Sequence, residues 1–420
     1  MESTNLTEEI KNLLEDEDPE IRLETIYYLC QHSKQDPTSV IKSYLAHNDY
    51  KLKSAALGCA SKHGGSATEL IDPDFFEDLL NKESKDIIVI KAQIADALGY
   101  IEDDQLSRKY LSQLLNDDHP SVVRKAINSM KRQQNDRFIP LLLQKLEYSE
   151  FKIAIRKALA SYGTDYLILY KDRFFDDTIS KNVRKSIPGI FSHLPTQTTA
   201  DHLFEMIDVE DPDLRYHVIK GLNKLLREKS SISMNTEKVR TTFKKEAKNF
   251  FELLAMKLLQ PPHHPNEILL KALDEKMGQS TERIFRLLGL IYDPRDMYGT
   301  YLALQSISPD KKSAAIEFLD NVLTEEDRSY LFPIIDNREE AEKMKIGREL
   351  FHIPNRRYDE GLLQLINGED LWLQICAIYS VSPQCPSGLQ SKVREVAESS
   401  NKLIKETAEL VIKRNTKASN

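Results

Sequence analysis

The chain has 420 residues, a formal net charge of −8 and only 14 glycines. This length exceeds the size at which one hydrophobic core usually stops growing, so it predicts several domains or an elongated repeat array and excludes one compact small domain. Charged residues make up 30% and hydrophobic residues 40% of the chain, which favours long solvated helices over a turn-rich β protein or a disordered chain.

Composition also sets expectations for compartment and targeting. The chain has four cysteines, which form neither a dense disulfide framework nor a CxxC pair, so a reducing compartment is expected. Residues 1–14 are acidic and lack the basic flank and apolar run of a signal peptide. Nowhere do 18 apolar residues run together, so no transmembrane segment is expected. These features predict a cytoplasmic protein.

An internal repeat organises the first half. A proline lies two residues before an apolar anchor at Ile21, Val122 and Leu214, and apolar or small residues recur four, five and eight positions after each anchor. This spacing places them on one helical face. The anchors lie 28 to 38 residues apart, which leaves room for two helices of about ten to fourteen residues and two turns. Weaker copies have their anchors at Leu52, Ile90, Ala154 and Asn182.

The predicted unit is therefore a helical hairpin whose second helix carries the anchor. The first helix ends in an apolar pair, as at Leu79-Leu80, Leu114-Leu115 and Leu142-Leu143. Small residues in the second helices are expected to let neighbouring helices approach closely, and they are Ala55, Ala56, Ala95, Ala126 and Ala158.

Three copies share a Val/Ile-Arg-Lys-Ala/Ser-apolar string, at 123–127, 155–159 and 183–187. With these strings the sequence resembles the HEAT-repeat family, in its short bacterial form with two helices per unit. The usual HEAT period is about 40 to 47 residues, so a period near 32 fits only the short variant. The resemblance implies an all-α fold, an α-α superhelix of the HEAT/armadillo-like solenoid class.

The second half is less regular. The expected organisation is an array of about seven hairpins over 1–227, a linker over 228–236 and an irregular helical array over 237–420. Segments 282–294, 315–323 and 403–408 resemble HEAT regions fused to bacterial carriers of the ATP/ADP-translocase type. This resemblance implies a regulatory or docking module, and no transport activity or nucleotide site is carried over.

Charge is distributed unevenly along the chain. Residues 1–120 carry a net charge of −12, residues 121–260 carry +8 and residues 261–420 carry −4. A basic middle between acidic ends is able to steer an acidic protein segment, or less readily a nucleic-acid backbone, onto the central repeats. The alternative is an ordinary solvated surface. The candidate partner-binding residues are Arg124, Lys125, Arg156, Lys157, Arg184 and Lys185.

A structural role is the favoured interpretation for the basic residue near the start of each second helix. Carboxylates in the turns favour helix N-termini and pair readily with arginines of adjacent units. The residues of this predicted structural ladder are Asp18, Arg22, Asp118, Asp211 and Arg215. The single tryptophan, Trp372, is expected in the core at a helix start.

No catalytic motif accompanies the repeat. The sequence has no GxxxxGK[ST], GxGxxG, HExxH or EF-hand spacing, so neither an enzyme nor a metal or cofactor site is expected. The predicted function is a non-catalytic scaffold or adaptor that binds a protein partner on a concave face built by the second helices. Two alternatives stay open: an anionic ligand such as nucleic acid on the basic middle third, or a module held at a membrane transport complex by a partner.

Overall fold

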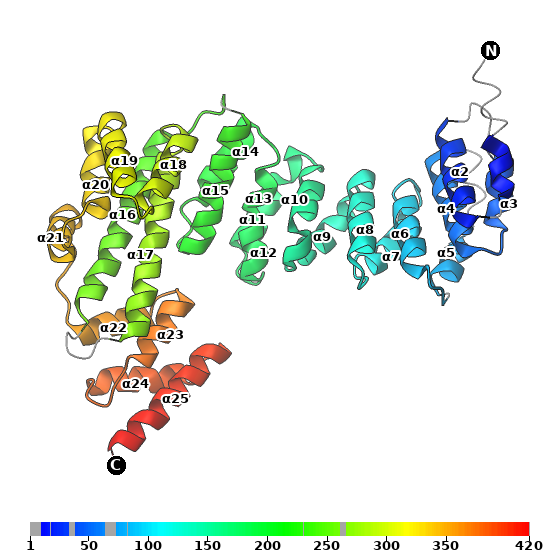
Figure 1. Cartoon of the computed structure of the whole chain (residues 1–420). Coiled ribbons are helices and arrows are strands. Elements are labelled where there is room, and N and C mark those ends of the chain that lie inside the picture. Colours follow the sequence, from blue (N-terminus) through cyan, green and yellow to red (C-terminus); the bar gives the residue numbers. More distant parts are fainter. Residues whose placement is uncertain are drawn as a thin grey trace. The chain divides into compact units, whose positions relative to one another are not determined.

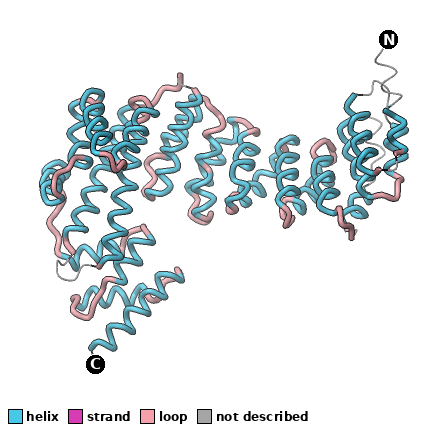
Figure 2. Tube along the Cα trace, in the orientation of Figure 1, coloured by secondary structure: helices cyan, strands magenta, loops and turns pink. Residues whose placement is uncertain are grey.

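The computed structural model describes residues 10–16, 18–32, 38–63, 73–81, 83–229, 231–260 and 266–419. These residues form helices joined by turns, and none of them belongs to a β-strand (Figure 2). The chain divides into two compact units, Met1–Leu194 and Pro195–Asn420. Each unit is built from packed helical hairpins, so the predicted all-α fold of HEAT-like solenoid class is confirmed.

In the first unit, first and second helices alternate along the chain (Figure 1). Short 3-10 turns precede three of the helices, at η3 (Asp136–Phe138), η4 (Ser149–Phe151) and η5 (Thr164–Tyr166). The first helices are η1 (Leu13–Glu15), α3 (Thr38–Leu45), α5 (Pro73–Leu80), α7 (Asp104–Leu114), α9 (Ile139–Lys145) and α11 (Leu167–Phe175). The second helices are α2 (Pro19–His32), α4 (Tyr50–His63), α6 (Ile87–Leu98), α8 (Pro120–Gln133), α10 (Lys152–Ala160) and the pair α12 (Lys181–Ser186) and α13 (Pro188–Phe191).

The second helices pack on one another in chain order, and we call them the second-helix row. Helix α2 packs on α4, α4 on α6, α6 on α8, α8 on α10 and α10 on α13. Short side chains allow this close packing, because they keep the helix backbones near each other. The five alanines that the sequence predicts at these contacts are fully buried, as expected: Ala55, Ala56, Ala95, Ala126 and Ala158.

The predicted anchor residue is buried in most copies of the repeat. In two copies the prediction lies one residue before the buried position. Ala154 is only half-buried and Asn182 is exposed, whereas the following residues, Ile155 and Val183, are buried. Counted from these residues, buried positions recur after three and four residues in both copies, and after seven residues the side chain is half-buried Tyr162 or buried Ile190, which is also a helical period. Ile21 is 39% exposed, so the first copy is anchored by the residues that follow it.

The second unit is centred on two long helices, α16 (Thr236–Leu258) and α17 (Glu267–Leu288), which pack along each other. Helices α20 and α21 pack on α16, while α15, α18 and α23 pack on α17. Segment 228–236, the predicted linker, connects α15 to α16 inside this unit. The other helices are α14 (Gln197–Met206), α15 (Pro212–Glu228), α18 (Pro294–Leu304), α19 (Pro309–Val322), α20 (Glu325–Ile335), α21 (Glu340–Phe351), α22 (Tyr358–Ile366), α23 (Leu371–Tyr379), α24 (Ser387–Val396) and α25 (Lys402–Ser419).

Carboxylates cap several of these helices, as the turn sequences predict. The Asp211 side chain accepts hydrogen bonds from the backbone N–H groups of Asp213 and Leu214 at the start of α15. Asp370 caps α23 in the same way and accepts from the N–H groups of Trp372 and Leu373. The expected core position of Trp372 is wrong, because its side chain is 47% exposed while Leu373 is buried. In the first turn of α23, the side chain that points toward the core is that of Leu373 and not that of Trp372.

A buried carboxylate, Asp327, ties α20 to α16. Its carboxylate is 1% exposed and accepts hydrogen bonds from Arg240 Nε at 3.2 Å and Nη2 at 3.1 Å. The hydroxyls of Tyr292 and Thr324 also donate to it, at 2.6 and 2.9 Å. Burial alone would raise the pKa of Asp327, but these hydrogen bonds, led by that of Arg240, hold it below the ordinary value of 3.8.

This depressed pKa predicts a loss of stability in acid. The stabilisation from ionised Asp327 is present above pH 3.8 and is lost as the pH falls through the lower pKa of the folded chain. We expect the free energy of unfolding, measured by urea titration over a pH series, to fall less steeply below this pH in Asp327→Asn than in wild type. Asp320→Asn is the control, because the Asp320 side chain is 60% exposed. Equal slopes in wild type and Asp327→Asn would contradict the prediction.

Candidate functional site

A groove of about 460 Å³ lies on the second-helix row of the first unit. Residues of α2, α4, α6 and α8 line it, so four successive hairpins contribute to one site. We call it the Asp96 groove. Its lining includes Tyr27, Gly58, Lys62, Ile88, Val89, Ala92, Gln93, Asp96, Ser121 and Lys125.

A hydrogen-bonded chain of side chains fixes one wall of this groove. The Gln93 amide on α6 donates to the Tyr27 hydroxyl on α2 at 2.6 Å, and the Ser54 hydroxyl on α4 donates to Gln93. Burial raises the pKa of Tyr27 to about 12, so its hydroxyl stays protonated at neutral pH. A Cβ added at Gly58 would meet no neighbouring atom within 4 Å, so the surface of α4 is open at that position.

Three cations surround one carboxylate in the groove. Asp96 on α6 lies 2.9 Å from Lys62 Nζ of α4, 3.7 Å from Lys125 Nζ of α8 and 3.4 Å from Arg132 Nη2 of α8. Burial alone would raise the pKa of Asp96, but the hydrogen bond from Lys62 and the three positive charges lower it. One negative charge is therefore outnumbered by three positive charges at this point.

Aromatic and apolar groups lie beside this charge. The Arg132 guanidinium lies 3.9 Å from the centroid of the Tyr100 ring, and Lys62 Nζ lies 5.6 Å from it. At the first turn of α6, Ile88 and Val89 remain 40% and 39% exposed. Arginine and aromatic residues are enriched in protein–protein interfaces, and the Arg132–Tyr100 stack is a pair of this kind.

The structure places the six predicted partner-binding residues in different environments. Lys125 lines the Asp96 groove, and Arg124 and Lys157 are exposed on α8 and α10. Arg156 Nε instead donates to the Ser186 carbonyl at 3.0 Å and covers Gly189. Arg184 Nε donates to the Phe174 carbonyl at 2.7 Å and Lys185 is half-buried. Arg156 and Arg184 thus hold helices together within the unit.

The ladder residues show a backbone role that the sequence interpretation missed. Arg22 donates to the Asp16 carbonyl, and Arg215 donates through Nη2 to the Val209 carbonyl at 2.7 Å. Together with Arg184, these arginines bind carbonyl groups in the last turn of the preceding helix or just after its end, where acceptors lack intrahelical partners. The sequence shows a basic residue at the same position of successive second helices, and this regularity could have indicated the shared backbone role.

Pairing between turn carboxylates and basic residues of adjacent hairpins also occurs. Lys91 Nζ on α6 lies 2.7 Å from Asp117 in the turn before α8. The neighbouring Asp118 is exposed, and the Asp18 backbone N–H donates to the Asp16 carboxylate at 2.8 Å. Arg215 forms its ion pair with Glu246 of α16 at 2.6 Å. Sequence periodicity located the correct turns but not the individual partners.

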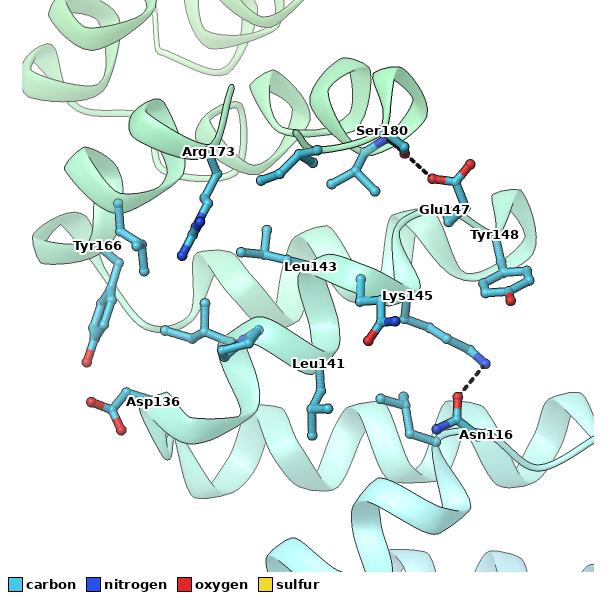
Figure 3. Close-up of a pocket in the computed structure, with 17 residues that line it drawn as sticks. Asn116, Asp136, Leu141, Leu143, Lys145, Glu147, Tyr148, Tyr166, Arg173 and Ser180 are labelled. Carbon is cyan, nitrogen blue, oxygen red and sulfur yellow. Dashed lines mark hydrogen bonds between the residues drawn. The ribbon is translucent and has the colours of Figure 1, made fainter. Parts of the chain in front are cut away.

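A second and larger pocket, of about 620 Å³, lies among the first helices α9 and α11 (Figure 3). Leu141, Leu143 and Leu169 contribute to its apolar lining. Two acidic and two basic residues also line it, so it carries no excess charge. Three of these four residues are hydrogen-bonded to neighbouring side chains. These bonds are Lys145 to Asn116, Ser180 and Asn182 to Glu147, and Arg173 to Asp176.

Of these two cavities the Asp96 groove is the stronger candidate site, because it combines unbalanced charge with exposed apolar side chains, whereas the charges that line the larger pocket cancel. Within the described part of the chain, no group of three or more metal-ligating side chains lies together. The helices among the described residues are too short or too polar to cross a membrane. The charged and apolar groups of the Asp96 groove are placed so that one bound segment can contact several hairpins.

Comparisons with known proteins add little to this picture. No protein-family model and no curated protein matches the sequence. Solved structures that match include the "Crystal structure of Kap121p bound to Pho4p", with a TM-score of 0.41 and 11% identity over 90% of this chain and 45% of that chain. A homology model of the full-length AP-3 complex matches with a TM-score of 0.36 and 12% identity over 98% of this chain and 90% of that chain. The chain spans less than half the length of the first of these. The predicted likeness to carrier-fused HEAT regions finds no support.

Proposed function

We propose that this protein is a non-catalytic helical scaffold or adaptor that binds a protein partner on the second-helix row of its first unit. One observation carries the proposal: the Asp96 groove combines exposed Ile88 and Val89 with cations from two flanking helices. Four successive hairpins line this groove, which suits a partner that contacts several repeats at once. The three cysteines with described side chains are free thiols, which suits a reducing compartment such as the cytoplasm.

The experiment must separate surface residues from structural ones. Alanine substitution of all six predicted basic residues would also remove Arg156 and Arg184, which bind backbone carbonyls inside the unit. Loss of partner capture would then follow from local unfolding as well as from a lost contact. The exposed apolar residues of the groove are better targets, because their removal breaks no described hydrogen bond.

We expect the double variant Ile88→Asp, Val89→Asp to lose its partner in affinity purification of the full chain. The two new carboxylates make the apolar part of the groove polar, so an apolar side chain of the partner can no longer be buried there. This should weaken binding by at least about tenfold. Ile168→Asp is the matched control, because Ile168 is 58% exposed on α11 and does not line the groove. A partner retained by wild type and control but absent from the double variant supports the proposal. Equal capture by all three proteins would contradict it.

A further inference from the structure

The chemistry of the Asp96 groove also indicates what kind of segment it takes. This inference rests on the proposed function, because it concerns the same surface. Around Asp96, three positive charges face one negative charge. The tightest pair is Lys62 with Asp96 at 2.9 Å, while Lys125 and Arg132 lie farther away, at 3.7 and 3.4 Å. Lys125 is the most loosely held of the three cations, whereas Arg132, at the edge of the groove, also donates through Nη1 to the Asp96 carbonyl at 3.3 Å.

We propose that the Asp96 groove binds an extended acidic segment of a partner protein, with a carboxylate of the partner at Lys125 and Arg132. Both cations remain accessible, since the Lys125 side chain is 49% exposed and that of Arg132 is 34% exposed. The guanidinium of Arg132 is already oriented by the Tyr100 ring, so little conformational entropy is lost when it binds a carboxylate. Charge complementarity thus selects an anion at this end of the groove.

The other end of the groove selects an apolar side chain. Ile88 and Val89 lie in the first turn of α6, and Ala92 lies between them and Asp96. Ile88 and Asp96 are eight residues apart on one helix, which corresponds to about 12 Å along its axis. An extended chain covers this distance in about four residues. The segment that fits therefore has an apolar residue about four positions from an acidic one.

An extended segment suits the length of the groove better than a helix of the same number of residues. Four residues span about 13 Å when extended but only about 6 Å in a helix. An extended segment therefore reaches both the apolar and the charged end with few residues.

The test measures fluorescence anisotropy of a labelled peptide on the full chain. The probe is a peptide of about ten residues with a leucine and, four positions later, a pair of glutamates. Wild type should bind it more weakly as salt increases, because the contacting charges are exposed. Lys125→Glu should weaken binding by at least about tenfold, because it places a like charge beside the peptide carboxylates. Lys131→Glu is the control, since Lys131 is exposed on the same helix and does not line the groove.

Each other outcome overturns the inference. Equal loss in Lys125→Glu and Lys131→Glu would mean that the peptide responds only to net charge. Equal binding of a peptide with lysines in place of the glutamates would exclude charge selection. Preferential binding of duplex DNA, with the same loss in Lys125→Glu, would assign the groove to nucleic acid. If the partner of the full chain depends on Ile88 and Val89 but the acidic peptide does not bind, this inference fails while the proposed function stands.

Discussion

Glu246→Ala is expected to destabilise the second unit by about 3–5 kcal/mol, because it removes the carboxylate from a buried ion-pair cluster. Glu246 on α16 is fully buried and lies 2.6 Å from Arg215 Nη1 of α15 and 2.8 Å from Arg283 Nε of α17. The Ser280 hydroxyl lies 3.2 Å from the same carboxylate. Arg283 is only 4% exposed, so the variant leaves its positive charge buried without this partner.

Urea unfolding of the full chain, followed by circular dichroism, measures this effect. Glu246→Gln keeps the size and some of the hydrogen bonds but removes the charge, so it should lie between wild type and Glu246→Ala. Glu252→Gln is the matched control on the same helix. Glu252 forms a half-exposed pair with Lys248 at 3.8 Å, which contributes less than about 0.5 kcal/mol. If Glu246→Ala and Glu252→Gln unfold at the same urea concentration, the cluster does not stabilise the unit.

Gly347→Ala is expected to destabilise the chain by about 1–3 kcal/mol through overpacking. Helix α21 packs on α16 at this glycine, and an added Cβ would lie 2.3 Å from Cδ1 and 2.6 Å from Cγ of Phe251. Phe251 is fully buried and its ring lies 5.8 Å from that of Phe351, measured between centroids. The ring therefore has little room to move aside, and the two helices must separate.

A second glycine provides the matched control. Gly299 lies inside α18, and an added Cβ there would meet no neighbouring atom within 4 Å. Gly299→Ala should therefore stabilise the chain by about 0.5–1 kcal/mol through its higher helix propensity. The double variant Gly347→Ala, Phe251→Leu tests the mechanism, because a smaller side chain at 251 should relieve the clash and make the two effects non-additive. Additive losses, or a neutral Gly347→Ala, would contradict overpacking.

The six basic residues show why sequence periodicity is a poor guide to a binding surface. Arg124, Arg156 and Arg184 occupy equivalent positions in three similar strings. In the structure Arg124 is exposed, whereas Arg156 and Arg184 donate to backbone carbonyls. The difference depends on which carbonyl groups lie near each guanidinium. A repeat pattern conserves the position of a side chain on its helix but not its surroundings.

The Asp96 groove was not predictable for a related reason. Lys62, Asp96 and Arg132 are about 35 residues apart in sequence and belong to three successive second helices. Each alone is typical of a solvated helix face. Ile88 and Val89 stand in an apolar run with the fully buried Ile90, and the sequence gives no sign that two of these three side chains remain exposed.

The sequence by itself determined the all-α fold, the hairpin period and the helix faces that form the core. These properties depend on the spacing of apolar and small residues along one helix, and Leu52, Ala95 and Ile127 are buried as their spacing predicts. Only the tertiary structure decided which charged residues meet and which apolar residues stay exposed. Glu246 and Asp96 acquire their roles from arginines and lysines on other helices, because electrostatic interactions depend on distance in space and not on separation along the chain.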